Sequence, residues 1–352
     1  RRLEMPRPRR PPPRCGQAAP AWAGLAEGCE VYALSAHVPE AEDALGPRGP
    51  EGEEEAGSWL SWDVAAWLFP FEALGILGRR PKGGVCTQSL LAALRQPGDL
   101  PAPPGGRRWA MGFADLLEGM RAVATSAGCP STRLTLRTSR RFSPAVARAL
   151  PSAAELKRPP RALLVGICYE ESSEWRLQGA WNDVSDLRRW LCSELCWPRD
   201  GVRVLSDRAP GAGARPTRAN ILRQLEWLLA GDRPEAGAGR SCRLLHFSGH
   251  GGEAELYPVD WETAGPISDG ELTGVLASGI GRWTTCTCIL DCCKSSTLFS
   301  SLAYKLQLPA GTPWPSDHGP SRAEVAAKPI MSLSSLRCSA GPGALSAPAG
   351  EK

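Results

Sequence analysis

Residues 244–252 read LLHFSGHGG, and residues 288–293 read CILDCC. Each stretch is an apolar run, as expected of a strand that is buried on both faces of a parallel sheet. Each run ends in a reactive side chain, which is His250 in the first stretch and Cys293 in the second. The carboxyl ends of parallel strands meet in the crevice where open α/β sheets place their active sites. The two stretches therefore predict an α/β fold in which a histidine and a cysteine lie together.

The region around these stretches alternates between strand and helix patterns. Apolar runs at 162–167 and 202–205 predict two further strands, and apolar residues at helical spacing predict a helix after each of them. Ser268 and Glu271 have the spacing of a capping box before another helix. This alternation favours a mostly parallel central sheet covered by helices on both faces.

The first 150 residues carry a weaker α/β pattern. Strands are expected at 30–35 and 134–136, and helices at 87–94 and 113–120, with Thr87 as a candidate N-cap. Composition and pattern together divide the chain into five parts. These are a disordered Arg/Pro-rich tail (1–27), a small α/β region (28–150), a linker (151–160), a catalytic α/β region (161–308) and a poorly ordered C-terminal segment (309–352).

The bulk composition excludes several classes of function. The 352 residues include 41 basic and 37 acidic side chains, a balance too even to indicate nucleic acid or an anionic membrane as the partner. The chain shows no signal peptide at its start and no apolar run of about 18 residues that could cross a membrane. Its 13 cysteines are therefore expected to be thiols in a reducing compartment. We expect a cytoplasmic protein.

The two reactive side chains suit nucleophilic catalysis. A thiol with a pKa of about 8.5 is mostly protonated at neutral pH, and a neighbouring imidazole can take its proton so that the thiolate attacks a carbonyl carbon. The glycines around His250 let the backbone approach a substrate, and the N–H of Gly251 is a candidate donor to a developing oxyanion. Asp291, two residues before Cys293, could bind a cationic side chain of the substrate.

A metal site is a weaker reading of the same cysteines. Cys286, Cys288, Cys292 and Cys293 could bind zinc, but their spacing lacks the paired C-x2-C knuckles of structural zinc sites. Cys286 and Cys288 lie two residues apart on one expected strand. Both side chains are therefore expected to point into the core.

Six motifs between residues 161 and 300 resemble those of the metacaspases, a family of caspase-like cysteine peptidases, and they occur in the family's order. They are ALLVGI (162–167), GAWNDV (179–184), PTRANI (216–221), HFSGHGG (246–252), LYPVDWET (256–263) and DCC (291–293). The resemblance implies a caspase-like sandwich with Cys293 as nucleophile and His250 as general base. It also implies that Asp183 and Asp291 line a pocket that selects Arg or Lys before the cleaved bond.

The N-terminal half resembles the small-subunit region of the same family, through EVYALSA (30–36), GGVCT (83–87) and FADLL (113–117). That region normally follows the catalytic region, whereas here it precedes it, as in the rearranged type III metacaspases. A second explanation stays open. Residues 328–335 faintly echo residues 31–36, so the chain could join the tail of one unit to the head of another in a tandem array.

The chain departs from the family pattern after the cysteine. Lys294-Ser295-Ser296 stands where the family usually has His-Ser-Gly. Lys294 either stabilises a thiolate at Cys293 or folds into the acidic pocket and blocks it. The acidic loop that the family places between Gly252 and Tyr257 is almost entirely absent.

The same departures affect calcium binding. Of the carboxylates that hold calcium in the family, the resemblance matches Glu253 and Asp269, whereas Gly270 and Ser300 replace two others. Calcium takes about 6–8 oxygen ligands, so these two carboxylates predict a weak calcium site or none. No other cofactor is expected.

Two functions follow from the sequence. The first is a cysteine endopeptidase that cleaves protein or peptide substrates after Arg or Lys. The alternative is a caspase-fold module without peptidase activity that acts as a regulator or binding partner, which the residues after Cys293 and the shortened loop would explain.

Overall fold

The computed structural model describes residues 29–37, 83–95, 112–126, 132–140, 150–230 and 240–307. The tail and the C-terminal segment expected at 1–27 and 309–352 lie outside these ranges. No helix among the described residues is long and apolar enough to cross a membrane.

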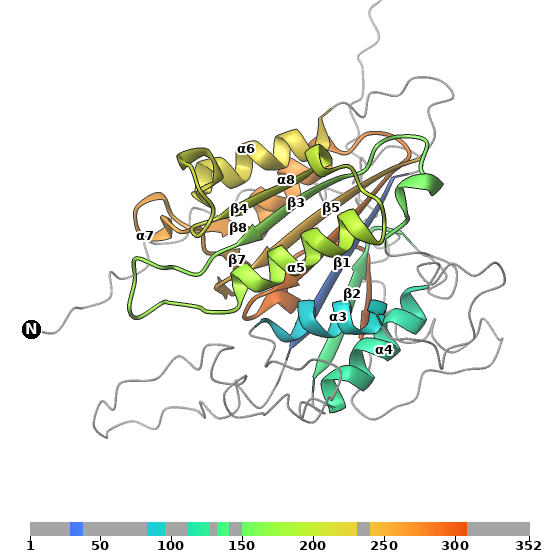
Figure 1. Ribbon diagram of the computed structural model, residues 1–352, viewed down its shortest axis with the longest axis horizontal. Coiled ribbons are helices and arrows are strands. Elements are labelled where there is room, and N and C mark those ends of the chain that lie inside the picture. The colour runs from blue at the N-terminus through green and yellow to red at the C-terminus, as the bar shows by residue number, and fades with distance from the viewer. Residues whose placement is uncertain are drawn as a thin grey trace, which may run out of the picture.

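A seven-stranded sheet forms the centre of the molecule, in the order β10-β2-β1-β9-β5-β3-β4 (Figure 1). The strands β1, β9, β5, β3 and β4 run parallel, and β2 is antiparallel to both of its neighbours. The predicted mostly parallel sheet is confirmed. The bounds are β1 Glu30–His37, β2 Arg133–Thr138, β3 Arg161–Gly166, β4 Val202–Ser206, β5 Ser241–Ser248, β9 Thr284–Asp291 and β10 Tyr304–Gln307.

Helices cover both faces of this sheet (Figure 1). One face carries α3 (Val85–Arg95), α4 (Phe113–Ser126) and α5 (Ala180–Ser193), and the other carries α6 (Arg218–Leu229) and α8 (Asp269–Gly279). Smaller elements are the helix α7 (Trp261–Ala264), the sheet of β6 (Gly251–Gly252), β7 (Glu255–Leu256) and β8 (Ile267–Ser268), and the 3-10 turns η3 (Ala153–Glu155), η4 (Arg199–Gly201), η5 (Ala212–Ala214) and η6 (Ser295–Thr297).

The apolar runs of the central strands feed two separate cores. In β3, Leu163 and Val165 pack into the core under α6 and α8, whereas Ala162 and Leu164 pack into the core under α3, α4 and α5. Successive side chains of a strand point to opposite faces, so a strand covered on both sides must be apolar throughout. This is the physical reason that the quoted stretches indicated the fold.

Helix starts follow the capping rules in part. Thr217 Oγ1 accepts from the Asn220 N–H at 3.2 Å at the start of α6, and Ser268 Oγ accepts from the Glu271 N–H at 3.2 Å at the start of α8. The predicted capping box is only half closed, because the Glu271 carboxylate pairs with Arg218 at 2.6 Å instead. Thr87 is not the N-cap of α3, since that helix already begins at Val85.

The N-terminal region shares this sheet with the strands that follow residue 160. Residues 30–35 of β1 pair in parallel with residues 285–290 of β9, and β2 then extends the sheet beyond β1. The domain boundaries drawn from the sequence stay a prediction. The two parts nevertheless meet in one continuous hydrogen-bonded ladder.

Candidate active site

Adjacent strand ends bring His250 and Cys293 to the same edge of the sheet. β5 and β9 are neighbours, with Ser248 beside Asp291, and each strand is followed two residues later by one of the reactive side chains. The Gly249 N–H donates to the Asp291 carbonyl at 3.2 Å. A Cβ on Gly251 would lie 2.9 Å from the carbonyl oxygen of Cys293, so only glycine allows the two loops to approach this closely.

Backbone contacts orient the His250 ring. Its Nε2 lies 2.8 Å from the carbonyl oxygen of Trp175. A carbonyl oxygen only accepts, so a neutral His250 ring carries its proton on Nε2 and leaves Nδ1 as the basic nitrogen. The His250 N–H donates to Tyr169 Oη at 3.0 Å, and that hydroxyl donates to the Tyr257 carbonyl at 2.6 Å. The ring is thereby preset as a proton acceptor.

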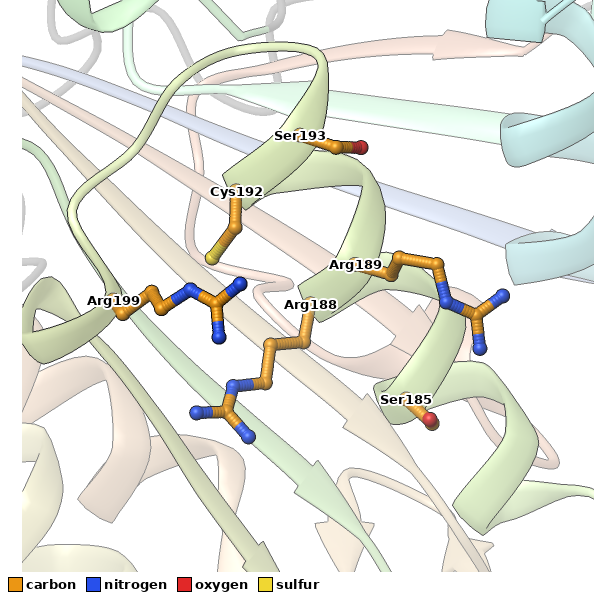
Figure 2. Close-up of a pocket in the computed structure, with 6 residues that line it drawn as sticks. All are labelled: Ser185, Arg188, Arg189, Cys192, Ser193 and Arg199. Atoms are coloured by element: carbon orange, nitrogen blue, oxygen red, sulfur yellow. The ribbon is translucent and has the colours of Figure 1, made fainter.

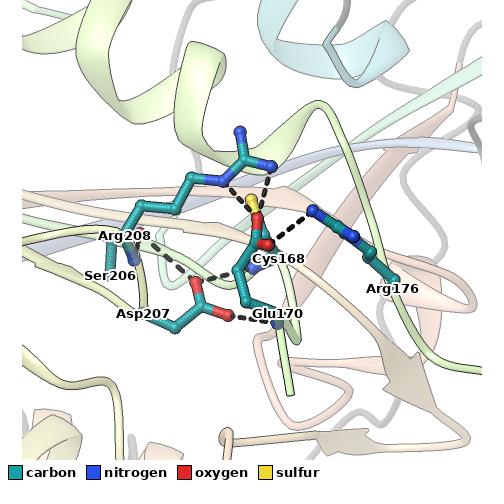
Figure 3. A network of polar contacts seen from close by, with 6 residues as sticks. All are labelled: Cys168, Glu170, Arg176, Ser206, Asp207 and Arg208. Atoms are coloured by element: carbon teal, nitrogen blue, oxygen red, sulfur yellow. Dashed lines mark hydrogen bonds and ion pairs between the residues drawn. The ribbon is translucent and has the colours of Figure 1, made fainter. Parts of the chain in front are cut away.

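The loop that supplies these contacts, residues 168–177, is itself held by ionised groups (Figure 3). Asp207 accepts from the N–H groups of Cys168 at 2.9 Å and of Glu170 at 3.0 Å. The Glu170 carboxylate pairs with Arg176 at 2.7 Å and also with Arg208. We call this segment the histidine-supporting loop. Neither Trp175 nor Tyr169 was foreseen from the sequence, because a backbone carbonyl leaves no trace in residue types.

Of the adjacent thiols, Cys293 is the accessible one. Cys293 is half-buried, whereas Cys292 is buried. Burial raises the pKa of Cys292 well above its usual value, and the neighbouring Cys293 and Asp291 raise it further. Cys286 and Cys288 lie in the core, as expected. Within the ranges that the structure describes, no three His, Cys, Asp or Glu side chains gather as metal ligands do, so the zinc reading gains no support.

Asp183 and Asp291 meet at the start of α3, where both are fully or nearly fully buried. Asp183 accepts from the Gly84 N–H at 2.9 Å, from Gln88 Nε2 at 2.8 Å and from Ser248 Oγ at 2.8 Å. Asp291 accepts from the Thr87 N–H at 2.7 Å. The N-terminal end of a helix carries partial positive charge, so this acid pair is bound by the chain itself.

Burial of the acid pair disfavours the charged form of both carboxyl groups. Burial raises the pKa of Asp183 well above its usual value, and the charge of Asp291 raises it further. Burial also raises the pKa of Asp291, against the hydrogen bonds from Thr87 and Cys86. Beside them, burial lowers the pKa of His246 to about 3, and its Nε2 lies 2.9 Å from Thr87 Oγ1. His246 is therefore a neutral partner of α3.

The polar residues at the start of α3 were missed as site residues. Thr87 and Gln88 are buried in α3, where Thr87 was expected only as a helix N-cap and Gln88 had no expected role. Polar side chains in such a helix were the available signal, since buried polar groups need partners.

Comparison with known proteins gives a family match for part of the chain. Residues 160–301 match the family model described as metacaspase, peptidase C14 domain. This part of the chain is a metacaspase domain. Metacaspase-1 of Eremothecium gossypii is 35% identical over 150 residues, which are 39% of this chain and 32% of that protein. Metacaspase-1B of Aspergillus fumigatus is 33% identical over 39% of this chain and 35% of its own length. Metacaspase-1 of Saccharomyces cerevisiae is 31% identical over 39% and 34%. The chain thus spans about a third of the length of these curated relatives.

In this metacaspase domain Lys294 lies at the surface. Its side chain is exposed, whereas Asp183 and Asp291 are buried, so Lys294 does not occupy the acidic pocket. Its backbone adopts the left-handed conformation, with φ 50° and ψ 20°. A side chain in that conformation costs roughly 1–2 kcal/mol, which is the cost that a glycine at this position would avoid.

We expect Lys294→Gly to raise the free energy of unfolding by about 0.5–1 kcal/mol, because relief of the left-handed strain exceeds the added entropy of the unfolded chain. Lys294→Ala separates conformation from charge, since it removes the ammonium group but keeps the strain. Denaturant unfolding of the three proteins measures the difference. A Gly variant no more stable than the Ala variant would contradict the strain argument.

Glu253 and Asp269, the two calcium candidates, lie close in the backbone, since the Asp269 N–H donates to the carbonyl of Ala254 at 2.7 Å. Glu253 is exposed. Asp269 is buried and already accepts from the N–H of Phe299 at 2.6 Å, from the N–H of Ser300 at 3.2 Å and from Ser300 Oγ at 2.8 Å. Calcium takes six or more oxygens, and the oxygens of Asp269 already accept these hydrogen bonds. The residues present do not fit the ion.

A cavity of the metacaspase domain lies away from His250 and Cys293. A space of about 320 Å³ opens along α5 and η4, and its lining holds neither His250 nor Cys293 (Figure 2). Arg189 in this lining pairs with Asp186 at 3.1 Å, and the groove is otherwise basic. This basic cavity is therefore separate from the candidate active site. The lining residues are Ser185, Arg188, Arg189, Cys192, Ser193 and Arg199.

Proposed function

We propose that the chain is a cysteine endopeptidase in which Cys293 is the nucleophile and His250 the general base. The observation that carries this proposal is the Nε2 contact of His250 with the Trp175 carbonyl, because it leaves Nδ1 to accept a proton at the strand ends that bring the two residues together. Nδ1 takes the thiol proton, and the Cys293 thiolate attacks the scissile carbonyl carbon. The imidazolium then protonates the leaving amine, and water hydrolyses the resulting thioester.

The backbone N–H of Gly251 is the proposed donor to the oxyanion of the tetrahedral intermediate. Gly251 lies against the carbonyl oxygen of Cys293, one residue from the proposed base. A preset N–H at such a position stabilises the charge that develops in the transition state.

We further propose that the substrate has Arg or Lys before the cleaved bond, bound by Asp183 and Asp291. Two buried carboxylates beside the nucleophile favour a cation through charge-assisted hydrogen bonds. Their present partners are the first N–H groups of α3. A substrate cation would compete with Gly84 and Thr87 for the same oxygens, so binding requires a shift at the start of α3.

The deciding experiment is hydrolysis of fluorogenic peptides that end in Arg, Lys or Asp. Cys293→Ala should reduce cleavage to background, whereas the matched control Cys292→Ala removes a buried thiol that has no role in the mechanism and should retain cleavage. Arg and Lys peptides should be cleaved and the Asp peptide should not. Undiminished cleavage by Cys293→Ala would refute the assignment of the nucleophile.

A second candidate function is a caspase-fold module without peptidase activity. Two features favour it. Asp183 already accepts three hydrogen bonds, which would oppose substrate binding, and the backbone of Lys294 next to Cys293 is strained, which would disturb the nucleophile. A chloromethyl ketone of an Arg peptide distinguishes the two functions. Covalent labelling at Cys293 supports the peptidase, and folded protein that is neither labelled nor active supports the module.

We propose a monomer in the cytoplasm, with protein or peptide substrates. None of the cysteines in the described part of the chain forms a disulfide, which suits a reducing compartment. The parallel pairing of β1 with β9 also favours a rearranged single unit of the type III kind over one joint of a tandem array.

A further inference from the structure

The turn that follows Cys293 is held by one buried cation and one buried anion. We call residues 293–300 the catalytic turn. Arg137, on β2 of the N-terminal region, donates from Nη2 to the carbonyl of Ser296 at 3.0 Å. At the other end of the turn, Asp269 accepts from the N–H groups of Phe299 and Ser300. The two charged side chains thus fix both ends of the 296–300 segment.

Arg137 is unusual for an arginine because only 8% of it is exposed. Its Nε and Nη1 are buried and have no hydrogen-bond partner. A buried donor without a partner destabilises the folded state, so a guanidinium persists there only with a compensating interaction. The charge of Asp269 acts on it in that sense, opposing the lowering of the Arg137 pKa by burial. The guanidinium remains cationic.

The surroundings of Arg137 explain why its charge faces the catalytic turn. Its neighbours in register are Ala33 on β1, which is small, and Lys305 on β10, which is also basic. Like charges directly across a strand pair repel. Burial lowers the pKa of Lys305, and the charge of Arg137 lowers it further. The groups that interact favourably with Arg137 are the Ser296 carbonyl, which accepts its hydrogen bond, and the Asp269 carboxylate, whose charge is opposite.

We propose that Arg137 is a built-in cation that positions the catalytic turn, so that the turn is assembled without a divalent ion. The donors around Asp269 do not fit calcium, whereas a guanidinium already supplies positive charge to the same turn. Arg137 is a positioning residue, which acts through the backbone of Ser296. The inference rests on the proposed role of Cys293, because it concerns how that thiol is presented.

The test compares Arg137→Met, which keeps length without charge, with Arg133→Met, which removes an exposed arginine from the same face of β2. The readouts are kcat and KM for an Arg peptide and the rate at which iodoacetamide alkylates Cys293, located by mass spectrometry. Each is measured in millimolar calcium and in a chelator. The wild type should behave alike in both. Arg137→Met should lose about 10- to 100-fold in kcat with little change in KM, and its Cys293 alkylation should slow.

Chemical rescue separates a missing cation from a misfolded protein. Millimolar guanidinium should restore part of the lost rate in Arg137→Ala, whereas sodium at the same ionic strength should not. Three results would overturn the proposal: wild-type activity or alkylation that requires calcium, an Arg137→Met variant equal to Arg133→Met, or a folded Arg137→Ala variant without rescue. If no peptide is cleaved yet alkylation still depends on Arg137, the proposed peptidase fails and the positioning role stands.

Discussion

His250→Ala is expected to lower kcat/KM for peptide cleavage by about 10²- to 10⁴-fold, because a positioned general base contributes that much to proton transfer. The Trp175 carbonyl holds Nε2, so Nδ1 is the nitrogen that the variant removes from the reaction. Without it the thiol must lose its proton to solvent. The rate of the variant should therefore rise steadily with pH where the wild-type rate levels off. Steady-state kinetics across the pH range measure both effects.

A second histidine of the same strand provides the control. His246 lies four residues earlier on β5, is fully buried and contacts Thr87 through Nε2. His246→Asn should lower stability, since it disturbs a buried contact, but should leave the shape of the pH–rate profile unchanged. Equal pH profiles for His250→Ala and the wild type would exclude His250 as the base.

Gly84→Val is expected to lower the free energy of unfolding by about 2–4 kcal/mol, through overpacking and the loss of buried hydrogen bonds. A Cβ on Gly84 would lie 2.2 Å from Asp291 Oδ2 and 2.4 Å from Oδ1. The start of α3 could therefore not stay packed against Asp183 and Asp291. Moving the helix start away would also break the Gly84 N–H contact with Asp183. Denaturant unfolding followed by circular dichroism measures the loss.

The control for this substitution is Gly274→Ala in α8, where a Cβ would meet nothing within 4 Å. An alanine in a helix interior is favoured over glycine by up to about 1 kcal/mol, so this variant should be as stable as the wild type or more so. If Gly84→Val were also neutral, the acid pair could not be held by α3 as described.

The sequence allowed the central sheet to be predicted because its strands are buried on both faces. The runs at 244–248 and 288–290 are apolar for that reason, and the matching of Ser248 with Asp291 then places the residues that follow side by side. Burial on two faces is a strong signal in a sequence. The expectation that a histidine and a cysteine lie together at strand ends follows from it, whereas the direct pairing of β5 with β9 was not predicted.

Other parts of the molecule carry no such signal. The strands β6, β7 and β8 are two residues each, too short for a periodic pattern. Thr87 was assigned to a helix cap, although its N–H serves Asp291, a residue more than 200 positions away. Arg137 shows only as one basic residue in a short strand. Its proposed role depends on its contact with Ser296, a residue distant in the sequence, which no local pattern encodes.

The position of β1 has a consequence for how the molecule would respond to a break in its backbone. β1 lies between β2 and β9, so a strand from the early part of the chain is an inner strand of the sheet and not an edge strand. A single cut between residues 150 and 160 would leave two polypeptides that share six paired positions of β1 and β9 and a common set of buried side chains. Such a nicked protein should elute as a single species in size-exclusion chromatography, and the two fragments should dissociate only in denaturant.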